Sequence, residues 1–161
     1  MSQLRPSVTA EPAGLSTPRA CRLERIRSRP QFEAALAGPP VAKTQHFALH
    51  MTDTSAQSGA HGLFPGGGTW LGVLIPKRWA RRAVTRNTLR RQIYAVAREL
   101  AHTLPPQALV VRLRNGFARD QFISATSDAL RSAARAELHE LLGDRLARRL
   151  RQQAVAGEPH A

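Results

Sequence analysis

The chain has 161 residues, of which 42% are hydrophobic, so its length and composition predict one folded domain with a substantial core. Its 24 Lys+Arg against 11 Asp+Glu give a formal net charge of +13, which favours a polyanionic partner because each neutralised phosphate releases condensed counterions. A lone cysteine, Cys21, excludes an internal disulfide and a cysteine-based zinc cluster, and no apolar stretch reaches the about 18 residues of a membrane span.

Both ends of the sequence predict disordered tails around a single domain at residues 21–150. Residues 1–20 are rich in Pro, Ser, Thr and Ala with few large apolar side chains, and residues 151–161 have a similar character. The N-terminal segment also lacks the apolar core of a secretory signal. We therefore expect a cytoplasmic protein that has no membrane partner.

The first predicted helix follows the sequence SRPQFEAALAG. Ser28 suits the N-cap position, Gln31 completes a capping box with it, and Pro30 fits the first turn. Gly38 is expected to end this helix, because glycine favours the end of a helix.

Two strands and a long loop are predicted next. Residues 41–51 alternate in the manner of a strand, with Phe47 facing one way and His50 the other. Residues 52–69 form a Gly/Ser-rich loop that is long for a compact domain. The apolar run WLGVLI at 70–75 is typical of a buried strand.

The remaining elements complete the predicted fold. A helix spans roughly 84–102 and is stopped by the prolines after it, and the run ALVVRL at 108–113 predicts a strand. The last helix runs from about 124 to 150, with an apolar stripe of Leu130, Ala134, Leu138, Leu141 and Leu142. The order α-β-β-α-β-α predicts an α+β fold: an α/β sandwich with one small mixed sheet of three or four strands packed with helices, like that of ribosomal RNA-binding proteins.

The helix after the second strand divides its residues between two faces. At 100° per residue, an arc of about 60° holds Leu89, Ile93, Val96 and Leu100. A different arc of about 140° holds Arg86, Asn87, Arg90, Arg91, Tyr94 and Arg98. We therefore expect one stripe of this helix to be buried and the other to be cationic.

The cationic stripe predicts a phosphate-rich partner. It extends before the helix through Lys77, Arg78, Arg81 and Arg82, next to the first free N–H groups, which add affinity for anions. Arg86 and Arg90 repel each other at a spacing of four residues, and no acid lies nearby to offset them. An arginine-rich face without a dedicated ligand is the alternative.

Two other classes of basic helix fit the sequence poorly. A DNA-reading helix should follow a three-helix unit with a tight turn, but a strand and a proline precede this one. A membrane-surface helix would carry Trp, Phe or several Leu on its apolar face. We therefore expect RNA, bound through its backbone, and no DNA.

Several segments resemble the bacterial ribonuclease P protein subunit. The segment RNTLRRQIYAVARE resembles its signature through Arg86-Asn87 and Arg90-Arg91, and LGVLIPKRWARRAV matches its paired basic positions through Lys77-Arg78. The segment CRLERIRSRPQFEAAL resembles its N-terminal region through Arg22, Leu23 and Phe32, and ALVVRLRNGF resembles its late strand. The sequence departs from the family pattern at Thr88, Tyr94 and the turn at 78–82.

This resemblance implies a subunit of an endoribonuclease whose catalyst is RNA. The holoenzyme removes the 5′ leader of precursor tRNA with Mg²⁺, which is bound mainly through RNA phosphates, so the implied partners are the catalytic RNA and precursor tRNA. No protein side chain is expected to be catalytic or to bind metal, and the scattered Asp53, Asp120 and Asp128 do not form the carboxylate cluster of a two-metal nuclease. The alternative function is a stand-alone RNA-binding or ribosomal protein with no role in cleavage.

The resemblance also implies two groups of binding residues. The catalytic RNA would be bound by Lys77, Arg78, Arg81, Arg82, Arg86, Asn87, Arg90 and Arg91. A leader cleft between the first helix and the sheet would be lined by Phe32, Leu36, Phe47 and His50, where bases stack on rings while cations follow the backbone. Plain core packing is the alternative for the two phenylalanines.

Overall fold

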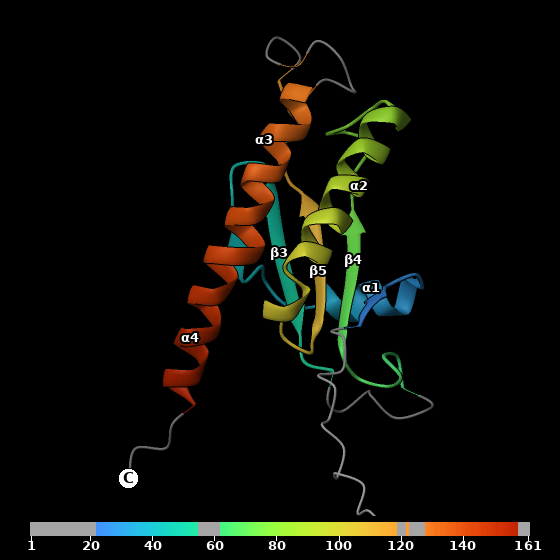
Figure 1. The fold of residues 1–161 in the computed structure, drawn as a ribbon. Helices are drawn as coiled ribbons and strands as arrows, with labels where there is room; N and C mark the ends of the chain where they lie inside the picture. The colour runs from blue at the N-terminus through green and yellow to red at the C-terminus, as the bar shows by residue number, and fades with distance from the viewer. Residues whose placement is uncertain (1–21, 55–61, 119–121, 123–127, 158–161) are drawn as a thin grey trace, which may run out of the picture.

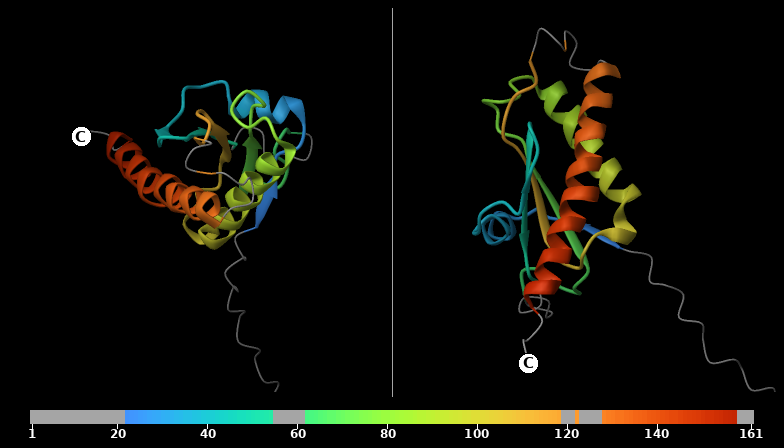
Figure 2. Two further views of the ribbon diagram at one scale, coloured as in Figure 1. Left: turned by 90° about the horizontal axis from the view of Figure 1, so that it is seen from above. Right: turned by 90° about the vertical axis from the view of Figure 1, so that its left-hand side faces the viewer.

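A five-stranded mixed sheet lies between helices in the computed structural model, which describes residues 22–54, 62–118, 122 and 128–157. The strand order is β1-β4-β5-β3-β2. The helices α2, α3 and α4 cover one face (Figure 1), and α1 lies on the opposite face (Figure 2). The elements are β1 (Leu23–Arg25), α1 (Arg29–Ala35), β2 (Ala42–Lys43), β3 (Phe47–Thr52), β4 (Thr69–Leu74), α2 (Ala83–Glu99), η2 (Ala101–Thr103), β5 (Ala108–Leu113), α3 (Asp128–His139), η3 (Glu140–Arg145) and α4 (Leu146–Ala156).

The predicted α+β sandwich is confirmed, but the sheet has more strands than expected. β4 pairs in parallel with β1 and β5, while β3 is antiparallel to β5 and β2. The segment 41–51, predicted as one strand, is divided by a turn in which the N–H of Thr44 donates to the carbonyl of Phe47 at 2.8 Å. β1 escaped prediction because three residues with two charges carry no clear alternation.

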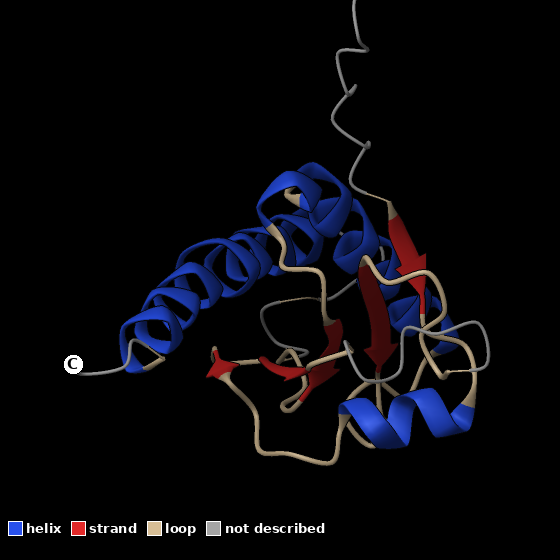
Figure 3. Cartoon of the chain, turned by 90° about the horizontal axis from the view of Figure 1, so that it is seen from below, coloured by secondary structure: helices blue, strands red, loops and turns tan. Residues whose placement is uncertain are grey.

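Alternation along the strands creates two separate cores, because successive side chains of a strand point to opposite faces. On β5, Leu109, Val111 and Leu113 are fully buried and belong to the large core that also contains the buried residues of α2, α3 and η3. Ala108 and Val110 belong to a smaller core with residues that pack around α1. Figure 3 shows the strands between these two helical layers.

The local signals for α1 are confirmed at its start but not at its end. Ser28 and Gln31 form the predicted capping box. The helix ends at Ala35, with Leu36 as its C-cap, rather than at Gly38, because two prolines follow that glycine and cannot continue a helix. The helix lies very close to the sheet: a Cβ added to Gly72 of β4 would lie 2.7 Å from Cε1 of Phe32.

The last helix extends further than the sequence predicted. α3 continues through the π-helical segment η3 into α4, which ends at Ala156, so residues 151–156, predicted to belong to a disordered tail, are helical. The reason is local, since Arg, Gln and Ala, which occupy most of these positions, are good helix formers. The predicted N-terminal tail at 1–20 lies outside the described residues. None of the described helices is both long and apolar enough to cross a membrane.

A half-buried polar cluster ties the start of β3 to α3. Glu137 accepts hydrogen bonds from the backbone N–H of His46 at 2.5 Å and from its ring at 2.8 Å, and a further one comes from the hydroxyl of Thr44. Burial acts to raise the pKa of Glu137, but these hydrogen bonds lower the pKa below its ordinary value. The ring of His46 also stacks on Phe117, with 4.0 Å between ring centroids.

We predict that Glu137→Gln lowers the free energy of unfolding by about 1–2 kcal/mol at pH 7, because charged hydrogen bonds are replaced by weaker neutral ones. The carboxylate contributes this stability fully above its ordinary pKa of 4.5, and the contribution is lost as pH falls through the lower folded-state pKa. Urea unfolding at pH 7 and near pH 3 measures the difference between the two proteins. A difference of the same size at both pH values would contradict this role for Glu137.

Candidate nucleic-acid interface

The predicted RNA-binding residues gather at the N-terminal end of α2 and in the turn before it. We call this set the RN surface: Lys77, Arg78, Arg81, Arg82, Arg86, Asn87, Arg90 and Arg91. All are exposed except Arg86, which is half-buried. Opposite them, Leu89, Ile93 and Val96 are fully buried, as predicted, and each contributes about 1.5–3 kcal/mol by leaving water. Packing of α2 on the sheet therefore leaves the cationic stripe exposed.

Arg86 has a structural role within the RN surface. Its Nη1 donates to the carbonyl oxygens of Ala80 at 3.0 Å and Arg81 at 2.8 Å, so the side chain closes the turn that enters α2. Among the described residues, the side chain of Arg90 makes only a long contact, with 3.4 Å between its Nη1 and Oδ1 of Asn87. Arg86 is therefore held in place by the protein, whereas Arg90 is free to orient toward a ligand.

The entry to α2 concentrates positive charge without an acidic side chain in the first turn of the helix. The N-cap residue, Arg82, makes no side-chain hydrogen bond to the helix, and the first turn holds no acidic residue. The positive end of the helix dipole therefore lies beside cationic side chains, an arrangement that an anion would stabilise.

The turn that carries Lys77 and Arg78 is fixed by backbone contacts. The N–H of Trp79 donates to the carbonyl of Pro76 at 3.0 Å. The backbone of Gly116 lies so close that a Cβ added there would be 2.8 Å from the carbonyl oxygen of Trp79. Trp79 is 38% exposed, and the guanidinium of Arg78 lies over its ring at 5.4 Å, so an aromatic ring and a cation stand together at the surface.

Tyr94 does not belong to the cationic stripe in which the sequence placed it. Its side chain is only 8% exposed, because Arg25 of β1 lies over its ring at 4.2 Å. At the far end of α2, Glu99 pairs with Arg135 at 2.6 Å and with His139 at 3.1 Å, and the hydrogen bond from Arg135 lowers the pKa of Glu99. The one acidic residue of α2, Glu99, therefore lies at the C-terminal end of the helix and is already paired.

The second predicted group is divided between the two faces of the sheet. Phe32 and Leu36 are half-buried on α1, and His50 is buried beside them, with its Nδ1–H donating to the carbonyl of Gly38 at 3.2 Å. Phe47 is fully buried in the large core on the opposite face, so its assignment to a cleft under α1 is wrong. The reason is the alternation of β3, in which residues separated by an odd number face opposite ways.

Electrostatics keep His50 neutral. Burial lowers the pKa of His50, the hydrogen bond to Gly38 acts in the opposite sense, and the positive charges of Arg112 and Lys43 lower the pKa further. His50 is therefore a neutral imidazole at pH 7.

The sequence reasoning missed Arg112, which lies on the same side of the sheet as α1. The register places it opposite Ala48 of β3 and Leu74 of β4. Its Nε is buried and has no hydrogen-bond partner among the described residues, a state that costs about 1–3 kcal/mol. A usable signal was present: an arginine interrupts the apolar run ALVVRL in the same alternation as Ala108 and Val110.

We call the sheet surface beside α1 the α1 face and define it by Lys43, Ala48, His50, Leu74 and Arg112. It combines two cations with apolar and aromatic side chains, which suits a single-stranded polyanion. Across the described parts of the chain, no three His, Cys, Asp or Glu residues come together in a way that could hold a metal ion. Both surfaces present cations that can bind a polyanion.

Comparison with known proteins gives one family. The sequence profile of the family described as Ribonuclease P matches residues 21–140. The ribonuclease P protein component of Bordetella parapertussis is 37% identical over 114 residues, which cover 71% of this chain and 85% of that protein. The corresponding protein of Ralstonia pickettii is 32% identical over 124 residues, covering 77% and 78%.

Solved structures share the fold. The ribonuclease P protein from Thermotoga maritima superimposes with a TM-score of 0.54 at 20% identity, covering 75% of this chain and 96% of that one. The Staphylococcus aureus ribonuclease P protein gives a TM-score of 0.53 at 16% identity, covering 73% and 91%. The chain therefore belongs to the family of ribonuclease P protein components, which are parts of an endoribonuclease holoenzyme.

Proposed function

We propose that this protein binds the catalytic RNA of ribonuclease P and the 5′ leader of precursor tRNA, and so assists removal of the leader by the RNA. The observation that carries the proposal is the RN surface, where exposed cations surround a helix N-terminus that has no acidic residue in its first turn. Family membership supplies the class of partner.

The RN surface is assigned to the catalytic RNA. Its arginines are spread along one face of α2, a geometry that suits contacts to phosphates rather than reading of base edges. Trp79, with the guanidinium of Arg78 over its ring, adds a surface on which an unpaired base can stack. Affinity at such a surface comes mainly from released counterions and should fall steeply with salt.

The α1 face is assigned to the leader. Arg112 has a buried donor that lacks an acceptor among the described residues, and a phosphate oxygen would supply one. Leu74 and the half-buried Phe32 provide apolar surface for unstacked bases on the same side of the sheet. The sugar–phosphate backbone would then run past Arg112 and Lys43.

We assign the binding of magnesium to the RNA. The described side chains do not fit a protein-held magnesium site, which would need carboxylate or carbonyl oxygens arranged around one point. The contribution of the protein is charge: cations that neutralise nearby phosphates reduce the repulsion that otherwise demands high concentrations of magnesium.

We predict that adding the purified protein to the catalytic RNA speeds leader removal from precursor tRNA at low magnesium concentration, and that the gain shrinks as magnesium rises. The rate of cleavage in single-turnover reactions is the measurement, with an unrelated protein of similar net charge as the control. No stimulation over that control would sink the proposed function.

Two arginines of the RN surface, Arg86 and Arg90, should differ in their effect on folding. Arg90→Ala and Arg86→Ala should each weaken binding to the catalytic RNA and lower the salt slope by about one phosphate contact or less. Arg86→Ala should also lower the free energy of unfolding by about 1 kcal/mol, because it breaks two hydrogen bonds to the turn, whereas Arg90→Ala should change stability by less than about 0.5 kcal/mol. Filter binding across a salt series and urea unfolding test both. Unchanged salt slopes in both variants would remove them from the interface.

Arg112→Gln should weaken binding of precursor tRNA by the holoenzyme by about tenfold while leaving mature tRNA almost unaffected, because only the precursor carries a leader. The glutamine keeps a polar side chain of similar length, so the fold should persist. Equal weakening of both substrates would show that Arg112 acts on stability or on the tRNA body instead.

A further inference from the structure

The end of the C-terminal helix lies beyond the part of the chain that matches the family. The family profile stops at residue 140, but the helix continues to Ala156. This extension adds Arg145, Arg148, Arg149 and Arg151, with Asp144 as the only acid between residues 141 and 157. A cationic element therefore follows the segment that defines the family.

The π-helical segment η3 keeps this extension against the sheet. Leu138, Leu142, Leu146 and Leu150 recur every four residues, a spacing that drifts by about 40° per step in a regular α-helix. A π turn holds more residues and so opposes that drift. Leu146 is only 1% exposed and Leu150 packs against the large core, so α4 stays docked beside the edge strand β2.

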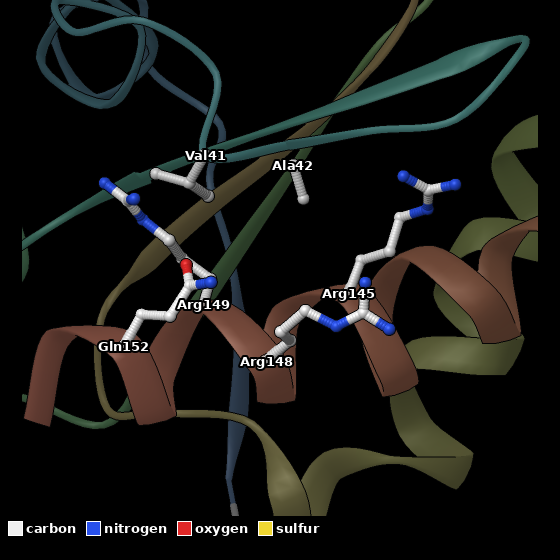
Figure 4. A pocket seen from close by; sticks show the side chains of 6 residues that line it. All are labelled: Val41, Ala42, Arg145, Arg148, Arg149 and Gln152. Carbon is white, nitrogen blue, oxygen red and sulfur yellow. The ribbon is translucent and has the colours of Figure 1, made fainter. Parts of the chain in front are cut away.

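A groove forms between α4 and the β2 edge. It is a hollow of about 170 Å³ lined by Val41, Ala42, Arg145, Arg148, Arg149 and Gln152. Figure 4 shows Arg149 reaching up beside Val41 and Arg145 rising on the other side of Ala42. One wall therefore carries the apolar side chains of Val41 and Ala42, and the other carries three guanidinium groups and an amide.

Two of the three arginines that line this groove are not paired by the described part of the fold. Arg145 pairs with Glu140 at 2.6 Å, but Arg148 and Arg149 form no ion pair with any residue that the structure describes. The helix dipole favours cations only in the last turn, and the last turn of α4 has none. Arginines at spacings of three and four residues repel one another along α4. An anionic ligand in the groove would relieve that repulsion.

The groove adjoins the α1 face across a single strand. Ala42 pairs with Leu49, whose side chain lies in the large core, whereas Lys43 pairs with Ala48 of the α1 face. Consecutive residues of β2 thus point to opposite sides of the sheet. A strand of RNA that crosses the α1 face toward β2 would meet Lys43 first and the groove next.

The RN surface and this groove are separated by the length of α2 and by the end of α3. Glu99, at the C-terminal end of α2, pairs with Arg135 and His139, which precede η3 and α4. The RN surface occupies the opposite end of α2, so RNA bound there is not directed toward α4.

We propose that the groove between α4 and β2 binds the phosphodiester backbone of single-stranded leader RNA after it leaves the α1 face. This inference rests on the proposed function, which assigns the leader to the α1 face. The guanidinium groups bind phosphates, and the site takes no part in bond cleavage.

The test compares Arg149→Gln with Arg151→Gln in the reconstituted holoenzyme. Both variants remove one arginine from α4, but only Arg149 lines the groove. Dissociation constants are measured for mature tRNA and for precursor tRNAs with a short and a long leader, over a salt series. Circular dichroism verifies that both variants keep their helices.

The expected result is that Arg149→Gln weakens binding of the long-leader precursor by about threefold or more and lowers its salt slope by about 0.7, while Arg151→Gln has less than half that effect. The short-leader precursor should bind equally well to both variants. Equal losses in the two variants, or the same loss with a short leader, would overturn the groove as a leader site. A wild-type holoenzyme without any preference for precursor over mature tRNA would instead contradict the proposed function.

Discussion

Alternation of side chains along the central strand β5 is the constraint on which both binding surfaces depend. Leu109, Val111 and Leu113 hold α2, α3 and η3 on one face, and this packing exposes the cationic stripe of α2. Arg112 points to the other face, beside α1. A shift of β5 by one residue would bury the arginine among the leucines and expose the core, so register and function are fixed together.

The parts of the structure that sequence reasoning predicted correctly depend on residues close together in the chain. The capping box of Ser28 and Gln31 and the buried stripe of α2 through Leu89 and Ile93 are set by spacings of three and four residues. The part of the RN surface that lies on α2 follows from the same helical geometry, since burying one stripe leaves the other exposed. The resemblance added what the spacing alone does not give, which is the family to which the chain belongs.

The parts that escaped prediction depend on contacts between distant segments. Arg25 covers Tyr94 because β1 pairs with β4. The residue pattern of neither strand alone indicates that the two strands pair. Phe47 was assigned to the leader although alternation already separated it from His50, so local reasoning, applied consistently, would have removed it. Arg112 stands out in the sequence as a charge within an apolar strand, but its place beside α1 depends on the strand order. Only the pairing of β5 with β3 and β4 brings it to the α1 face.

The proposed function assigns the catalytic RNA and the leader to different surfaces, the RN surface and the α1 face. Photocrosslinking distinguishes the two surfaces: a photoreactive nucleotide is placed within the leader, the assembled holoenzyme is irradiated, and the modified peptides are identified. We expect adducts in β3, β5 and α1, around His50 and Arg112. Adducts confined to α2 and the turn before it would contradict this division of the molecule.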